Sequence, residues 1–266
     1  MSDGETRFGG IQRLFGNDGI QRLHAAHVCV VGIGGVGSWA VEALARSGIG
    51  TLTLVDLDEV CISNVNRQIH ALDGTVGRPK VDVMAERIRA IHSACRVIVQ
   101  PQFFSETTAE TLLSPRFDYV LDAIDGVTNK TLLLARCRQR RIPVVACGGA
   151  GGRRAAAAVR VADLSKVTHD RLLAEVRKRL RKHHDFPVDG KSMGVDCVFS
   201  PEPPVFAGED GTICETRPDA EEGTRLNCNG GLGSATFVTG TFGFVAAGLI
   251  VNRIAGVRTS AYRAVS

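Results

Sequence analysis

The sequence predicts an α/β protein with a doubly wound, mostly parallel sheet, followed by an antiparallel and helical elaboration. Short apolar runs alternate with segments of helical periodicity over about residues 25–150. Such alternation is typical of parallel strands joined by right-handed crossovers. A glycine-rich turn joins the first apolar run to the first helical segment, and after a second glycine group at 148–152 the pattern changes. The elaboration therefore occupies the second half of the chain.

The first half is expected to hold an N-terminal arm and helix (1–24) and a core of alternating elements (25–150). Apolar residues at helical spacing, such as Val83, Met84, Ile88 and Ile91, give the helices one buried face each. The expected strands are 28–31, 51–56, 96–100, 119–123 and 143–147, and the expected helices are 7–24, 36–47, 80–92 and 129–141.

The second half (151–266) is expected to pack on the first as an elaboration, so that the chain is one domain overall. We expect an antiparallel strand over 155–161, a basic helix over 170–184, a short strand over 197–200 and loops over 186–192 and 201–224. Residues 232–251 carry no charge over a length that could span a bilayer. This run is rich in Gly, Ser and Thr, and a buried core helix is favoured over a membrane anchor.

The cysteines indicate a reducing compartment. None of the eight forms a C-x-x-C pair, which argues against a structural zinc of that type. Residues 1–10 contain no apolar run of the kind that a secretory signal needs, so we expect a cytoplasmic protein with free thiols. The net charge of +4 permits an acidic partner without requiring one.

A glycine cluster indicates a Rossmann-like nucleotide site. The cluster reads G-x-G-G-x-G between a strand and a helix, with glycines at Gly32, Gly34, Gly35 and Gly37. Glycines allow the backbone to approach a phosphate closely, and the following helix N-terminus offers N–H groups to it. Asp56 ends the second strand, where an acid accepts hydrogen bonds from ribose hydroxyls. Up to this point a nicotinamide dehydrogenase and an ATP-dependent enzyme are both compatible.

Polar and cationic residues in the next segment favour a triphosphate. Asn64, Arg67 and Gln68 come soon after Asp56, and Lys80 begins a helix. A guanidinium can bind phosphate oxygens in a forked geometry, and an ammonium adds a point charge. Taken singly, Arg67 could form a surface ion pair and Lys80 could be solvated. Taken together at these positions, they favour ATP.

Two carboxylates lie at the carboxyl end of the fourth predicted strand. Asp122 and Asp125 form D-x-x-D at the edge where ligands bind in such sheets. A carboxylate beside phosphates indicates Mg²⁺. For Asp122 itself, capping of the following turn is the favoured role.

These motifs resemble those of the ubiquitin-activating-enzyme-like adenylyltransferases. G-x-G-G-x-G, D-x-D (Asp56 and Asp58), N-x-x-R-Q, a lysine and D-x-x-D occur in the family's order over at least residues 7–150. The resemblance implies that a substrate carboxylate attacks the α-phosphate of ATP, giving an acyl adenylate and pyrophosphate. It also implies residue roles. The nucleotide would be bound by Gly32, Gly34, Gly35, Gly37, Asp56, Asp58, Asn64 and Gln68, the phosphates also by Arg67 and Lys80, and Mg²⁺ by Asp125.

The resemblance further implies a homodimer. Family members lend an arginine from the N-terminal arm to the partner's site, and Arg13 is favoured for this role over Arg7. The protein-activating members usually carry two C-x-x-C pairs, which are absent here. By contrast, "RFGGIQRLFG", "NRQIHAL", "GGAGG", "GVDCVFS" and "TFGFVA" resemble the tRNA threonylcarbamoyladenosine dehydratases almost from end to end. Those enzymes use ATP to cyclise a threonylcarbamoyl side chain on tRNA, and the resemblance also implies sulfur-transfer proteins as partners.

Basic clusters suit an RNA substrate. The predicted helix 170–184 carries Arg177, Lys178, Arg181 and Lys182 off its apolar stripe, and two further groups are Arg153 with Arg154 and Arg138 with Arg140 and Arg141. Such clusters can neutralise phosphates, although an amphipathic helix with a solvated face has the same pattern. Three alternatives to the dehydratase remain at this point: an activator of a sulfur-carrier protein, a nicotinamide dehydrogenase and an inactive scaffold.

Several other residues have structural roles as their favoured interpretation. Cys147 and Cys197 adjoin motifs of the resemblance, but buried cysteine commonly behaves as a small apolar residue. His70 is expected to form a loop hydrogen bond, and Trp39 is expected to lie in the core.

Overall fold

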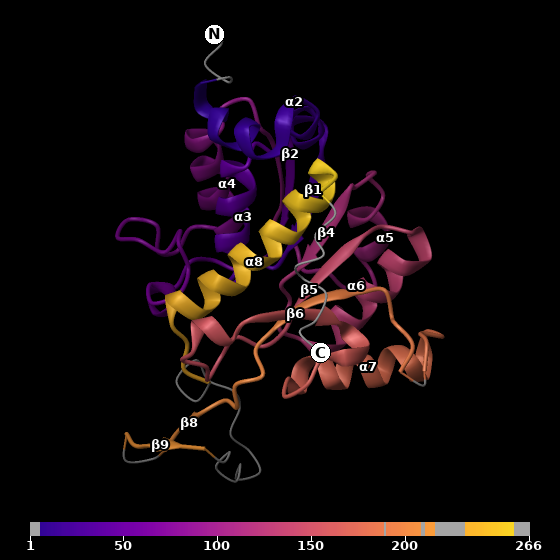
Figure 1. Ribbon diagram of the computed structural model, residues 1–266. Helices are drawn as coiled ribbons and strands as arrows, with labels where there is room; N and C mark the ends of the chain where they lie inside the picture. The colour runs from indigo at the N-terminus through magenta and orange to yellow at the C-terminus, as the bar shows by residue number, and fades with distance from the viewer. Residues whose placement is uncertain (1–5, 189, 209–210, 216–231, 258–266) are drawn as a thin grey trace.

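The computed structural model describes residues 6–188, 190–208, 211–215 and 232–257. Its main sheet has seven strands in the order β3-β2-β1-β4-β5-β7-β6 (Figure 1). All neighbouring pairs are parallel except β6 and β7, which are antiparallel. The strands are β1 (His27–Val31), β2 (Thr51–Val55), β3 (Arg96–Gln100), β4 (Tyr119–Asp122), β5 (Val144–Cys147), β6 (Arg160–Asp163) and β7 (Asp196–Phe199). The predicted mostly parallel sheet with an antiparallel addition is confirmed.

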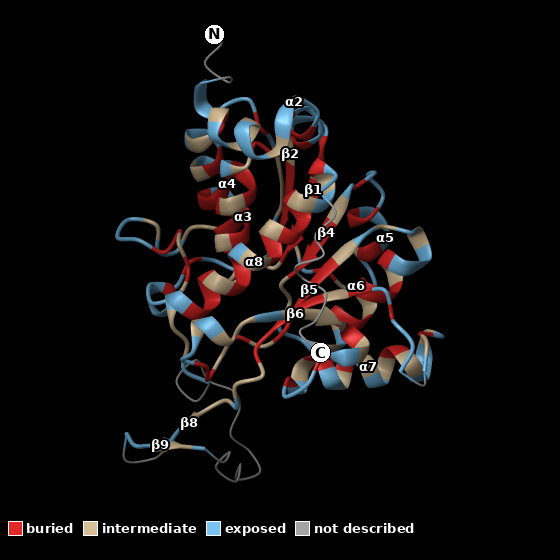
Figure 2. Cartoon of the chain, in the orientation of Figure 1, coloured by how far each residue is buried: buried red, intermediate tan, exposed pale blue. Residues whose placement is uncertain are grey.

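Helices cover both faces of this sheet. Val28 and Val30 of β1 pack in the core beneath α3 (Gly37–Arg46), α4 (Lys80–Ile91) and α8 (Thr236–Ala255). Cys29 and Val31 point the other way and pack with α5 (Ala109–Leu112) and α6 (Val127–Arg140). Side chains alternate along a strand, so a strand with apolar residues at every position is buried on both faces. Figure 2 shows the buried residues concentrated where these helices meet the sheet.

Helix α7 (Arg171–His183) covers the same face as α6, at the end of the sheet formed by β5 and β7. Leu173, Val176 and Leu180 are fully buried there, as their helical spacing predicts. Asp170 caps the helix, because its Oδ1 accepts a hydrogen bond from the Leu173 N–H at 2.9 Å. The chain passes from β6 through α7 into β7, so the basic helix is an insertion between two antiparallel neighbours.

The apolar helix α8 lies in the core, as the sequence predicts. In length and composition it could cross a membrane, and no other helix of the described ranges could. It packs along α3, and Val238, Phe242, Ala246 and Ile250 are buried. A Cβ at Gly243 would lie 2.6 Å from the Val36 carbonyl oxygen and 2.8 Å from the Ala40 nitrogen. Only glycine allows the two helices to approach this closely.

Helix α2 (Gly9–Ala25) lies at the amino end of the strands. The Gly50 N–H, just before β2, donates to the Leu23 carbonyl oxygen at 3.1 Å, and Thr51 donates to that of Ala26 at 3.0 Å. In Figure 1 this helix is at the top of the molecule, whereas α7 is near the bottom. The carboxyl ends of the parallel strands therefore lie at the end of the molecule opposite α2.

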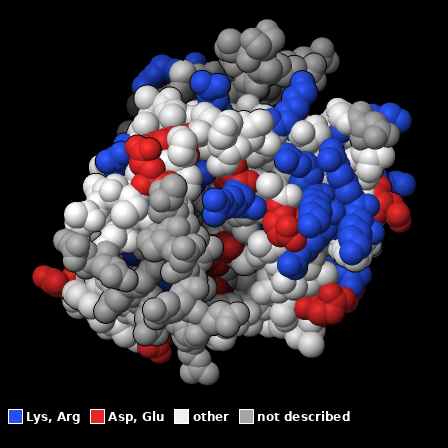
Figure 3. All heavy atoms as spheres, turned by 90° about the horizontal axis from the view of Figure 1, so that it is seen from below, with Lys and Arg blue, Asp and Glu red and all other residues white. Residues whose placement is uncertain are grey.

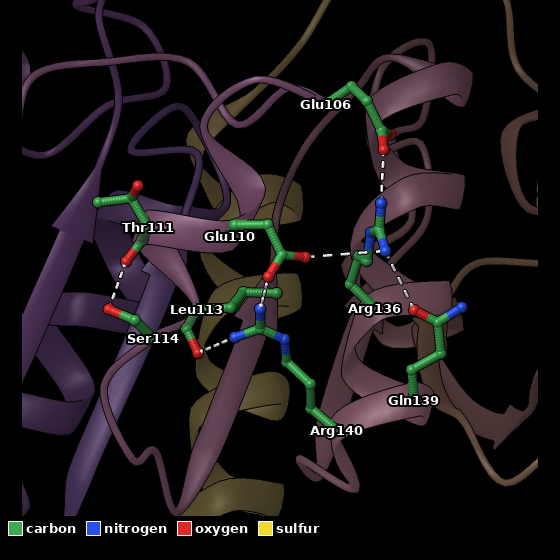
Figure 4. A network of polar contacts seen from close by, with 8 residues as sticks. All are labelled: Glu106, Glu110, Thr111, Leu113, Ser114, Arg136, Gln139 and Arg140. Carbon is green, nitrogen blue, oxygen red and sulfur yellow. Dashed lines mark hydrogen bonds and ion pairs between the residues drawn. The ribbon is translucent and has the colours of Figure 1, made fainter.

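Ion pairs fasten the short helix α5 to α6. Arg136 donates to Glu106 at 2.5 Å and lies 3.7 Å from Glu110, while Arg140 binds Glu110 and the Leu113 carbonyl oxygen (Figure 4). The sequence pattern did not predict α5. A single helical turn is too short to show a periodicity, and its position depends on these contacts with α6.

Two expectations for the second half are wrong. The strand expected over 155–161 is a 3₁₀ turn at Ala156–Ala158 followed by β6, because alanines have little tendency to form strands and pairing with β7 sets the register. The loop expected over 201–224 contains a small antiparallel pair, β8 (Phe206–Ala207) and β9 (Ile213–Cys214). Residues 209–210 and 216–224 of that loop lie outside the described ranges.

Candidate functional site

The glycine turn bends tightly from β1 into α3. Gly32 has a φ of 92°, and a Cβ at Gly37 would lie 1.8 Å from the Gly32 carbonyl oxygen. These two glycines are therefore required by the turn itself. A Cβ at Gly34 would meet no atom of the described residues within 4 Å, so this position has room for a bound group. Among the described residues no side chain caps α3, and the first N–H groups of a helix can bind an anion.

Asp56 holds the glycine turn in place. Its Oδ2 accepts from the Ile33 N–H at 2.6 Å, and its Oδ1 accepts from the Asp58 N–H at 2.8 Å. Burial raises the pKa of Asp56, while the charge of Lys80 and these N–H groups oppose that effect. Each carboxylate oxygen keeps a lone pair for a further donor, such as the ribose hydroxyl that the sequence predicts.

Lys80 is the first residue of α4 and carries a nearly buried ammonium. Its Nζ lies 2.7 Å from Asp58 Oδ2, and its backbone N–H donates to the Asp58 carbonyl oxygen at 3.0 Å. The Lys80 side chain is 7% exposed, whereas that of Asp58 is 53% exposed. A buried cation held by an accessible carboxylate can exchange that partner for a phosphate at little cost in desolvation.

Arg67 lies beside the glycine turn. A Cβ at Gly35 would lie 3.4 Å from the Arg67 Cδ, so the arginine stem runs along the turn. Its Nη1 donates to the Ser63 carbonyl oxygen at 2.7 Å and to Asn66 Oδ1 at 3.0 Å. Its carbonyl oxygen accepts from Trp39 Nε1 on α3 at 2.9 Å. Trp39 is half-buried rather than deep in the core as expected, and this bond fastens the arginine segment to α3.

The two other candidate residues of this segment, Asn64 and Gln68, are buried. Asn64 Oδ1 accepts from the Cys61 N–H at 3.0 Å and so stabilises the 3₁₀ turn Ile62–Asn64. The structure gives Asn64 a role in shaping the loop. Gln68 is 5% exposed, and its Oε1 has no hydrogen-bond partner among the described residues. An unpaired buried oxygen is costly, so a donor from a bound molecule would lower the free energy here.

Asp122 and Asp125 have different surroundings. Asp122 is completely buried, forms an ion pair with Lys130 at 2.8 Å and accepts from the Ile124 N–H at 3.0 Å. The expected capping role of Asp122 is confirmed, and its engagement with Lys130 leaves it unsuited to bind Mg²⁺. Asp125 is exposed on the same turn and has no ion-pair partner in the described part of the chain. One accessible carboxylate beside phosphates is a donor set that fits Mg²⁺.

The sequence pattern did not predict the buried position of Lys130. It lies on the buried face of α6 with Leu133, Leu134 and Cys137, at the spacing of an apolar stripe. A lysine in such a stripe signals a buried partner, and Asp122 is the acid at the end of the adjacent strand.

A second buried ion pair organises the glycines that follow β5. Asp170 Oδ2 accepts from the Gly149 N–H at 2.9 Å and lies 3.7 Å from the Arg153 guanidinium. Arg153 also donates to the carbonyl oxygens of Gly149, His169 and Ser200. Arg153 is buried, so the expectation that it contacts RNA phosphates is wrong. Its role is to hold the end of β5 against the start of α7.

The remaining candidates either lie apart from the glycine turn or are unreactive. Arg13 is exposed on α2, at the amino end of the strands. It therefore lies at the opposite end of the fold from Arg67 and the glycine turn. Burial raises the pKa of the Cys147 thiol to about 12 and that of Cys197 well above its usual value, so both remain protonated and structural. Among the described residues, no three His, Cys, Asp or Glu side chains gather into a metal site.

His70 differs from its expectation. The side chain is buried, and neither ring nitrogen has a hydrogen-bond partner in the described ranges. Burial lowers its pKa to about 4, and the charges of Lys80 and Arg87 add to that effect. The imidazole is therefore neutral at physiological pH, and the expected loop hydrogen bond is absent from its ring.

The fold and site together define a Rossmann-like nucleotide-binding protein in which cations and a carboxylate surround a glycine turn. A family model described as "ThiF family" matches residues 10–264. The chain belongs to the ThiF family.

Within this family the similarity is to tRNA threonylcarbamoyladenosine dehydratases. The protein of that name from Escherichia coli (strain K12) is 50% identical over 241 residues, 90% of each chain. The dehydratase from Haemophilus influenzae is 45% identical over 255 residues, and the match covers 94% of each chain. A crystal structure of the E. coli dehydratase in complex with ATP has a TM-score of 0.84 and 45% identity, covering 95% of this chain and 96% of that one. The predicted resemblance is thus confirmed.

Proposed function

We propose that this protein uses ATP to remove one water from threonylcarbamoyladenosine in tRNA, closing a ring. Two observations carry the proposal. Relatives named for this dehydration match the chain along 90% or more of their length, and one of them has been crystallised with ATP. In this chain, Arg67, Lys80 and Asp125 come from three separate segments and lie at the carboxyl end of the strands with the glycine turn.

The chemistry proceeds in two steps. An oxygen of the threonyl carboxylate attacks the α-phosphorus of ATP, and pyrophosphate leaves with the electrons of the broken P–O bond. A nucleophilic atom within the same side chain then attacks the activated carbonyl carbon and loses its proton, and AMP leaves. Over the two steps, ATP is converted to AMP and pyrophosphate, and the nucleoside loses the elements of one water. Because the second attack is intramolecular, its effective molarity is high and no enzyme thiol is needed.

The residues of the site have distinct roles in this proposal. The glycine turn and the N-terminus of α3 bind phosphate, and Asp56 binds the ribose while holding the turn. Arg67 and Lys80 neutralise the charge that develops on the phosphates, with Lys80 exchanging Asp58 for phosphate oxygen. Asn64 and Gln68 shape and line the pocket. Asp125 would hold Mg²⁺ together with phosphate oxygens, and the ion would supply charge neutralisation.

Two copies of the chain would complete each site. Arg13 lies at the amino end of the strands, so it can serve a glycine turn only in another copy of the protein. Exposed Phe237 and Phe244 on α8 provide apolar surface for such an assembly. We further propose that the protein acts in the cytoplasm and that sulfur-transfer proteins are additional partners.

A direct experiment tests the function. The purified protein is incubated with ATP, Mg²⁺ and tRNA carrying the open modification, and the digested nucleosides are weighed by mass spectrometry. Loss of one water in an ATP-dependent reaction is expected. Arg67→Ala and Asp125→Ala should lose at least about 100-fold in rate, as removal of a charge-stabilising group typically does. The exposed Asp73→Ala, in a neighbouring surface turn, is the control. Unchanged nucleoside mass with active ATP binding would remove the substrate assignment.

A further inference from the structure

The basic residues of α7 are not equivalent. The helix contains six Lys or Arg residues and a single acid, Glu175. Leu173, Val176 and Leu180 bury one side of the helix. The exposed cations are Arg171, Lys178 and Lys182, which are spaced by seven and four residues and so share the solvent face.

The other three arginines of α7 have internal partners. Arg177 donates to the carbonyl oxygens of Leu164 and Val167 at 2.9 and 2.8 Å. Arg179 pairs with Glu175 at 3.2 Å, and Arg181 donates to the Pro187 carbonyl oxygen at 3.1 Å. No acid within the described ranges pairs with the three exposed cations, so their charge is available to an external anion.

The other basic clusters expected to contact RNA present fewer cations on a single helix face. Arg140 is bound to Glu110 (Figure 4), and the Arg138 guanidinium stacks 4.3 Å above the Phe186 ring. Arg153 is buried against Asp170. Arg138 is exposed on α6, whereas Arg141 and Arg154 are exposed outside the helices, so in these clusters the described residues give no helix face with three exposed cations. The structure therefore separates α7 from clusters that look similar in sequence.

Helix α7 is also close to the candidate site. Its N-terminal cap, Asp170, binds the backbone of Gly149 just after β5. In the middle of the helix, Arg179 Nη1 donates to Thr128 Oγ1 at 3.1 Å, and Thr128 is three residues after Asp125. Figure 3 views the molecule from the end opposite α2 and shows Lys and Arg side chains gathered on one side of that face, with acidic side chains near its middle.

We propose that the solvent face of α7, formed by Arg171, Lys178 and Lys182, binds the phosphate backbone of the tRNA beside the modified base. This proposal rests on the proposed function and adds the surface that positions the substrate. Lysines and arginines on a helix that follow one line fit a run of phosphates, and such contacts position an RNA without reading its sequence. The modified adenosine itself is then presented to the turn that carries Asp125.

The test compares two double variants with equal changes in charge. Lys178→Glu/Lys182→Glu alters the α7 face. Arg89→Glu/Arg116→Glu alters exposed arginines on α4 and before β4 that have no ion-pair partner in the described part of the chain. Binding of unmodified tRNA is measured by fluorescence anisotropy at several salt concentrations, and ATP binding is measured separately. We expect the α7 variant to lose at least about tenfold in tRNA affinity and about two units of salt slope, with unchanged ATP affinity. The control should bind tRNA within about threefold of the unaltered protein, because steering by net charge is weaker than contact.

Equal tRNA binding by the two variants would overturn the proposal. The proposal would also be overturned if anionic lipid vesicles or polyglutamate competed fully with tRNA for the unaltered protein. The face would then serve another class of anion. Failure of the proposed function is a different result: the unaltered protein would bind tRNA through α7 and still leave the nucleoside mass unchanged.

Discussion

Lys130 on α6 and Asp122 at the end of β4 form a completely buried ion pair, with 2.8 Å between Nζ and Oδ2. The same carboxylate caps the turn that leads to Asp125, through the Ile124 N–H. The pair therefore sets the path of the segment that carries the proposed magnesium ligand. Burial raises the pKa of Asp122 and the charge of Lys130 opposes this, so the acid depends on its partner to stay ionised.

Removal of Lys130 alone should destabilise the protein. Lys130→Met leaves a buried carboxylate without a counter-charge, and such changes cost about 3–5 kcal/mol of unfolding free energy. The double variant Lys130→Met/Asp122→Asn should recover a large part of this loss, because the amide oxygen can still accept from Ile124 and no charge is stranded. Urea unfolding followed by circular dichroism measures both. Equal stability of Lys130→Met and the unaltered protein would contradict the importance of the pair.

The glycine turn offers a comparison between two neighbouring positions. A Cβ at Gly37 would clash with the Gly32 carbonyl oxygen, so Gly37→Ala should lower the Tm by several degrees, since the backbone must shift. A Cβ at Gly34 meets nothing, so Gly34→Ala should keep the Tm and weaken ATP binding by crowding the phosphate. Thermal unfolding and calorimetric titration with ATP separate the two effects. A drop in Tm for Gly34→Ala with unchanged ATP affinity would argue against the phosphate at this turn.

Lys80 should matter to catalysis more than to folding. Lys80→Met leaves Asp58 half exposed, where a carboxylate is readily hydrated, so the stability loss should be small. The rate of ATP-dependent dehydration should fall by about 100-fold or more, because a cation near the phosphates is removed. Arg78→Met is a matched control, since Arg78 is nearby, partly exposed and paired with Glu86. A rate for Lys80→Met equal to that of the control would exclude a phosphate-binding role.

His70 predicts a pH dependence of stability. Its pKa is about 4 in the folded protein and about 6.5 when unfolded, so between these values the unfolded chain binds more protons. The contribution of His70 to stability is thus fully present above about pH 6.5 and is lost as the pH falls towards 4. Relative to His70→Leu, the unaltered protein should lose on the order of 2–3 kcal/mol over this range. Parallel curves of unfolding free energy against pH for the two proteins would contradict the lowered pKa.

The sequence predicted those features that depend on local pattern. Alternating apolar runs located five parallel strands, and the glycine spacing placed the nucleotide turn at the end of β1. The order of Asp56, Arg67, Lys80 and Asp125 along the chain identified residues that the fold brings to one edge of the sheet, because carboxyl ends of parallel strands meet there.

The features that sequence reasoning missed depend on contacts between distant segments. Lys130 has the spacing of an apolar residue, and only the end of β4 explains its burial. Arg153 has the sequence pattern of a surface cation in a basic run. In the structure it is buried, because it forms an ion pair with Asp170, which lies 17 residues later in the sequence. The availability of the α7 lysines is likewise a matter of which acids lie near them in space.

The insertion of α7 between β6 and β7 has an evolutionary consequence. The strands from β1 to β5 that build the ATP end of the sheet are complete before the chain reaches this helix. Substitutions on the solvent face of α7 leave its buried residues and its cap, Asp170, unchanged, so they can accumulate without disturbing the proposed ATP site. Under the proposed function, the acceptor surface can therefore change in charge independently of the phosphate site.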